Sequence, residues 1–85
     1  MVSIRITNQT GQRRLVFVEP EAADFWQEPG ETFELRADGD PSAASFELVQ
    51  TADGLTVYPE GSSGPILVFR SGRELACGHQ RPTDW

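Results

Sequence analysis

The chain has 85 residues, which is enough for one small domain with a single core, and we expect residues 1–85 to form that domain. It carries 13 acidic and 7 basic residues, and the net charge of −6 argues against non-specific binding to nucleic acid. A single cysteine excludes an internal disulfide, and no apolar stretch approaches the roughly 20 residues of a membrane span. Because residues 1–7 lack the basic segment and apolar run of a signal peptide, we expect a cytoplasmic protein.

The first third of the chain reads mostly as strand. Apolar and polar residues alternate over residues 2–7, which predicts a half-buried strand. The continuous apolar run 15–18 predicts a strand that is buried on both faces and is ended by Pro20. Residues 21–27 fit either a short helical turn or an edge strand.

Turn residues then separate further alternating runs. These runs are residues 32–37, 45–48 and 55–58. Asp53-Gly54 predicts a hairpin, with either a two-residue turn or a four-residue loop from Thr51. Both choices direct Leu55 and Val57 into the core.

The last hairpin has a two-residue turn at Ser71-Gly72, which places Arg70 opposite Arg73 and Ile66 opposite Cys77. Its core face would then hold Ile66, Val68, Leu75 and Cys77. Its outer face would hold Leu67, Phe69 and Ala76. We expect this apolar outer face either to be covered by residues 20–27 or by the tail with Trp85, or to form a homodimer through Leu67 and Phe69.

Seven short strands, or eight if residues 22–27 add one, predict a single antiparallel β-sandwich. Three motifs fit that prediction: Ile4-x-Ile6-x-Asn8-x-Thr10, Val18-Glu19-Pro20 and Glu28-Pro29-Gly30-Glu31-Thr32-Phe33. With them the chain resembles small bacterial β-sandwich proteins and immunoglobulin-like or cupredoxin-like bacterial modules. The resemblance implies a Greek key of one of these two kinds, and it transfers no functional residue.

Cys77 and His79 are the only cysteine and the only histidine. A blue-copper site needs two histidines and usually a methionine, and the only methionine is Met1. Zinc would need Cys77 and His79 with two carboxylates such as Glu74 and Asp84. A Cys–His nucleophilic pair would need an exposed thiol. Because the hairpin register buries Cys77, we expect no metal and no cofactor, with a metal-binding or redox protein as the alternative.

Acidic residues are concentrated in residues 19–40, where Arg36 is the only base. Phe25 and Trp26 lie inside this segment, and on extended backbone adjacent side chains point to opposite faces. We therefore expect either that one aromatic enters the core and one lies near the surface, or that both are buried. The sequence predicts a non-enzymatic protein-binding module for a basic protein partner, without nucleic acid or membrane. Its expected site residues are Glu21, Asp24, Phe25, Trp26 and Glu28.

Overall fold

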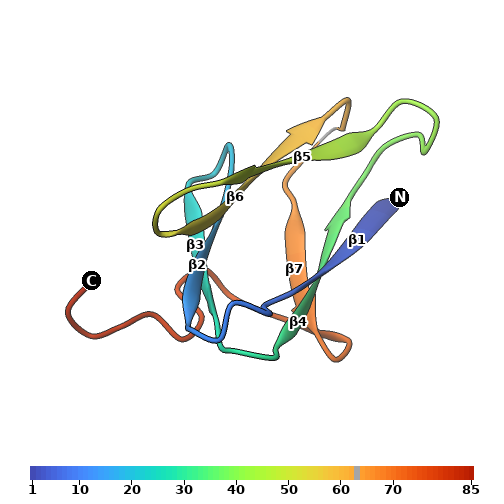
Figure 1. The fold of residues 1–85 in the computed structure, drawn as a ribbon. Coiled ribbons are helices and arrows are strands. Elements are labelled where there is room, and N and C mark those ends of the chain that lie inside the picture. The colour runs from blue at the N-terminus through green and yellow to red at the C-terminus, as the bar shows by residue number, and fades with distance from the viewer. Residues whose placement is uncertain (63) are drawn as a thin grey trace.

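The computed structural model describes residues 1–62 and 64–85, and its strands form two four-stranded sheets (Figure 1). Sheet A has the order β1 (Val2–Thr7), β4 (Thr32–Ala37), β7 (Leu67–Arg70), β8 (Arg73–Glu74). Sheet B has the order β3 (Ala23–Gln27), β2 (Arg14–Val18), β6 (Gly54–Glu60), β5 (Ser45–Gln50). The all-β class is confirmed, and residues 23–27 resolve as a strand.

The core lies between the two sheets because each sheet turns one apolar set of alternating residues inward. Sheet A contributes Ile6, Phe33, Leu35, Ala37 and Val68. Sheet B contributes Val16, Val18, Phe25 and Val57. The alternation expected for residues 2–7 and 32–37 is therefore the pattern that packs the two layers. The described residues include no helix long and apolar enough to cross a membrane.

One strand pair departs from the antiparallel arrangement expected from the sequence. β2 runs parallel to β6, with Leu15 beside Gly54 and Val18 beside Val57. The approach at Gly54 is close, since a Cβ atom there would lie 2.0 Å from the carbonyl oxygen of Leu15. Only glycine fits this position, so the residue expected to mark a hairpin turn also allows the parallel pairing.

The run 15–18 is not buried on both faces, so that expectation is wrong. Val16 and Val18 are buried, whereas Leu15 and Phe17 on the outer side of sheet B are half-buried. No strand of sheet A reaches this outer side, because the two sheets meet on their inner faces. The strand has one core face and one partly exposed apolar face.

The hairpin at Ser71-Gly72 has the expected register at its tip, with Arg70 opposite Arg73. The expected burial of Cys77 opposite Ile66 is wrong, because Cys77 is exposed. β8 ends at Glu74. The amide of Leu75 still donates to the carbonyl of Val68 at 2.8 Å, and beyond Leu75 the chain leaves sheet A.

The tail after Leu75 crosses to the edge of sheet B and runs beside β3 (Figure 1, orange to red). The amide of Gly78 donates to the carbonyl of Asp24 at 2.6 Å, and the amide of Trp26 donates to the carbonyl of His79 at 2.8 Å. The tail therefore covers the β3 edge, and the outer face of the last hairpin stays uncovered by it.

Candidate binding face

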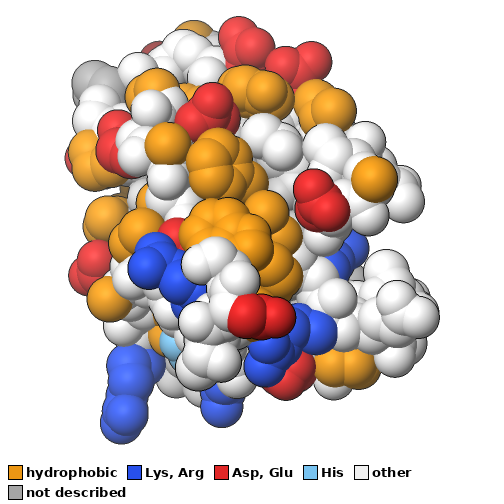
Figure 2. All heavy atoms as spheres, turned by 90° about the vertical axis from the view of Figure 1, so that its left-hand side faces the viewer, with side chains coloured by type: hydrophobic (Ala, Val, Ile, Leu, Met, Phe, Trp, Pro, Cys, Tyr) orange, Lys and Arg blue, Asp and Glu red, His pale blue; other side chains and the backbone are white. Residues whose placement is uncertain are grey.

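The outer side of sheet B carries an apolar surface that we call the aromatic face. It consists of Leu15, Phe17, Trp26, Val49 and Tyr58, with Trp85 from the tail. Val49 and Tyr58 are each 38% exposed, and Trp85 is 59% exposed. Figure 2 looks onto this side of the molecule and shows hydrophobic side chains gathered in its centre, with arginines in the lower half.

Strand pairing orders this face in rows. Phe17 lies beside Thr56, which lies opposite Val49. One row further along, Tyr58 lies opposite Glu47, and the amide of Glu19 donates to the carbonyl of Val57 at 2.9 Å.

Tyr58 therefore has a glutamate on each side, Glu47 from β5 and Glu19 from the turn directly after β2. Neither Glu19 nor Glu47 forms an ion pair with the residues that the structure describes. The row thus joins an exposed aromatic ring to two uncompensated carboxylates.

Asp24 also lies on the outer side of β3, but the tail covers it and leaves it 2% exposed. Arg81 donates to both of its oxygens, from Nε to Oδ2 at 2.8 Å and from Nη2 to Oδ1 at 2.6 Å. The Trp26 indole N–H donates to Oδ2 at 3.0 Å, and the Cys77 thiol lies 3.5 Å from Oδ1. The hydrogen bonds from Arg81 lower the pKa of Asp24 to about 2, although burial acts in the opposite direction. Asp24 thus fastens the tail to β3.

Phe25 and Trp26 divide between core and surface, which confirms the first of the two expectations for this pair. Phe25 is 5% exposed, and Trp26 is half-buried beneath Trp85. The two indole rings meet edge to face, with centroids 5.5 Å apart. The Gln80 side chain donates to the carbonyl of Trp26 at 2.7 Å, which holds the tail alongside.

The acidic segment 19–40 does not form one surface, because β3 belongs to sheet B and β4 to sheet A. Four of its carboxylates are ion-paired, in the pairs Asp24–Arg81, Glu28–Arg13, Glu31–Arg70 and Glu34–Arg36. Of the expected site residues, Glu21 is exposed at the β2–β3 turn, and Glu28 lies 3.1 Å from the Arg13 Nε atom. Trp26 is the one that belongs to the aromatic face.

Sequence reasoning missed two fully buried amides at one end of the sandwich, Asn8 and Gln27. Asn8 donates to the carbonyls of Gln12 and Gln27. Gln27 donates to the carbonyls of Ile6 and Glu31 at 3.0 and 2.8 Å. Asn8 lies two residues after the buried Ile6, and Gln27 lies two residues after the buried Phe25. Strand alternation therefore could have predicted that both amides point into the core. Their hydrogen bonds satisfy backbone groups that water cannot reach.

Cys77 and His79 lie in different surroundings. The Cys77 thiol is exposed beside Asp24, whereas the His79 ring is half-buried against Phe33 at a centroid distance of 6.0 Å. Within the described residues, no group of three or more His, Cys, Asp or Glu side chains could hold a metal ion.

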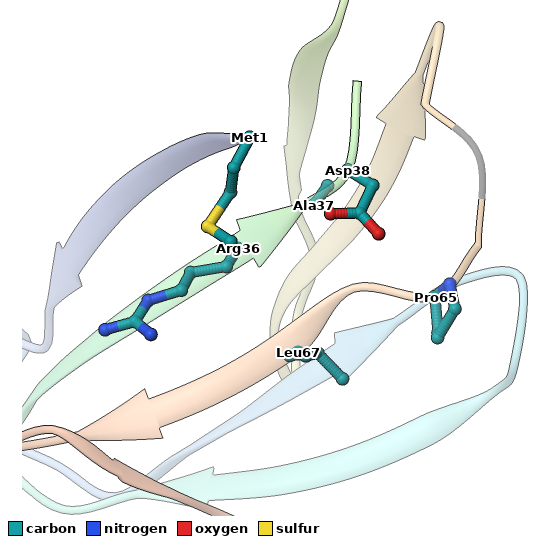
Figure 3. Close-up of a pocket in the computed structure, with 6 residues that line it drawn as sticks. All are labelled: Met1, Arg36, Ala37, Asp38, Pro65 and Leu67. Atoms are coloured by element: carbon teal, nitrogen blue, oxygen red, sulfur yellow. The ribbon is translucent and has the colours of Figure 1, made fainter. Parts of the chain in front are cut away.

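The surface expected to form a homodimer is partly covered by an arginine. Leu67 is 39% exposed, and the Arg36 guanidinium lies over the Phe69 ring at 3.8 Å. A hollow of about 170 Å³ adjoins Leu67, and Figure 3 shows its charged groups, Arg36 and Asp38, pointing away from each other. This hollow brings no polar groups together for chemistry.

Comparison of the chain with protein-family models, with curated proteins and with solved structures finds no match.

Proposed function

We propose that the protein is a non-enzymatic binding module that recognises another protein through the aromatic face. One observation carries the proposal: apolar side chains from all four strands of sheet B gather on its outer side, and Tyr58 and Val49 among them are each 38% exposed. Contiguous exposed apolar surface and clustered aromatic rings are typical of protein interfaces.

The charges around this face favour a partner with an apolar centre and basic side chains at its rim. Glu19 and Glu47 flank Tyr58, and Glu21 is exposed at the adjoining turn. The net charge of −6 would steer such a partner during encounter.

In this proposal the residues expected from the sequence have different tasks. Trp26 contacts the partner and the exposed Glu21 attracts it, whereas the charge of Glu28 is already paired with Arg13. Phe25 and Asp24 are buried residues of β3: Phe25 supports the face from the core, and Asp24 fastens the tail through Arg81.

We also propose a fold type for the two sheets and a location of the protein in the cell. We place the connectivity among immunoglobulin-like or cupredoxin-like Greek keys, since the chain passes between the two sheets repeatedly along its length. A cytoplasmic location is supported by the exposed, unpaired Cys77, which suits a reducing compartment.

The test is affinity measurement with the partner that co-purifies with the chain from its own host. Tyr58→Ala and Phe17→Ala should each weaken binding about tenfold or more, as expected for residues at the centre of an interface. Leu67→Ala is the matched control, because Leu67 is similarly exposed but lies on sheet A. Glu19→Gln with Glu47→Gln should mainly slow association and reduce its salt dependence. A partner whose affinity depends on Leu67 but not on Tyr58 or Phe17 would show that sheet A is the interface.

A further inference from the structure

The described residues form a second hollow, which is separate from the aromatic face. It lies where the β7–β8 turn meets the tail and has a volume of about 330 Å³. It is lined by Arg70, Ser71, Arg73, Leu75 and His79. Two arginines, a serine, a leucine and the only histidine of the chain therefore line one small space.

The two arginines are placed unfavourably for a protein without a ligand there. Arg70 and Arg73 are directly opposite in the last rung of the hairpin, and like charges in that position repel each other. Glu31 pairs with Arg70. Arg73 forms no ion pair with any described residue, so one positive charge at the hollow is uncompensated.

We propose that this hollow binds a small oxyanion, a phosphate or a carboxylate, that carries an apolar group. The arginines supply the planar, charged donors that oxyanions prefer. Ser71 lies in the turn between them, and Leu75 contributes an apolar side chain to the lining beside His79. The charged contacts are assigned to the arginines, and the His79 Nε2 atom is buried and has no hydrogen-bond partner among the described residues.

The proposal is tested by nuclear magnetic resonance, since His79 is the only histidine and its ring signals need no assignment. Inorganic phosphate, phenyl phosphate and benzoate are titrated at fixed pH and ionic strength, with chloride as the balancing anion. At least one of the three probes should shift the His79 ring and Leu75 methyl signals to saturation. A phosphate site should prefer phenyl phosphate, and a carboxylate site should prefer benzoate.

The matched variants are Arg73→Gln and Arg13→Gln, which remove the same charge inside and outside the hollow. Arg73→Gln should weaken binding of the saturating probe about fivefold or more, because a charge-assisted contact is lost. Arg13→Gln should leave the affinity within about twofold of the parent protein. Shifts that stay linear for all three probes, or an affinity that Arg73→Gln leaves unchanged, would overturn the proposal.

Discussion

Asp24 is a carboxylate that is removed from water and yet stays charged. Arg81 and the Trp26 indole together give it three N–H donors, and the hydrogen bonds from Arg81 contribute most to lowering its pKa from 3.8 to about 2. The shift corresponds to about 2 kcal/mol of stability. Solvent screening reduces that figure to about 1 kcal/mol, because the Arg81 side chain is 45% exposed.

We expect Asp24→Asn to lower the free energy of unfolding by about 1 kcal/mol at neutral pH, measured by urea unfolding. Because the folded-state pKa is lowered, the stabilisation is present above about pH 4 and is lost as the pH falls through 2. The difference in stability between the parent protein and the variant should therefore shrink over this window. Asp38→Asn, at an exposed loop position, is the control for the loss of one carboxylate, and it should lower the free energy of unfolding less than Asp24→Asn does. A stability difference that stays constant down to pH 2 would show that the Asp24–Arg81 pair does not stabilise the fold.

At the scale of elements, the tail after β8 decides which surfaces are covered. It leaves sheet A at Leu75 and adds its backbone to the β3 edge of sheet B. An exposed sheet edge invites pairing with another chain, and here the protein's own tail occupies it. Ionic contact at Asp24 and ring contact at Trp26 hold the tail there.

The accessibility of Cys77 reports the path of the tail. Since the thiol is exposed in the folded protein, we expect a thiol reagent to label it under native conditions, within about tenfold of the rate in urea. The measurement has no background, because the chain has no other cysteine. Protection of Cys77 until the protein unfolds would instead mean that β8 continues to residue 77 and buries the thiol opposite Ile66.

At the scale of the whole molecule, the net charge opposes association between copies of the protein, whereas the aromatic face favours it. The charge of −6 keeps copies apart at neutral pH, and it vanishes near the isoelectric point of about 4.5. At that pH Asp24 is still ionised, since its pKa is about 2, so the tail remains fastened. Near this pH the aromatic faces of different copies are no longer kept apart by net charge and can associate.

We expect light scattering to rise near pH 4.5 and the double variant Tyr58→Ser with Val49→Ser to suppress most of the rise. Both substitutions leave the charge unchanged, so they test apolar contact alone. Leu67→Ser with Met1→Ser removes two exposed apolar side chains elsewhere and should change the scattering little. Equal scattering from both double variants would show that the aromatic face has no special part in association.

The sequence by itself determined most of the strands and their core faces, but it left residues 21–27 open between a helical turn and the strand β3. Alternation identified the inward residues of β1 and β4, and turn chemistry set the hairpin register at Ser71-Gly72. Alternation offered one aromatic of Phe25 and Trp26 to the core and left open that both are buried. These features depend on residues that are close in the chain, where backbone geometry alone directs each side chain.

The tertiary structure decided which strands are neighbours, and with that the candidate site. Only the parallel pairing of β2 with β6 brings Phe17 and Tyr58 onto one surface. Only the crossing of the tail to sheet B exposes Cys77 and lets Arg81 neutralise Asp24. The alternation of apolar and polar residues along a strand shows which way each side chain points. It carries no information about which other strands or tail residues lie beside it. The Phe17–Tyr58 surface and the Asp24–Arg81 pair join residues that are far apart in the chain, so only the tertiary structure brings them together.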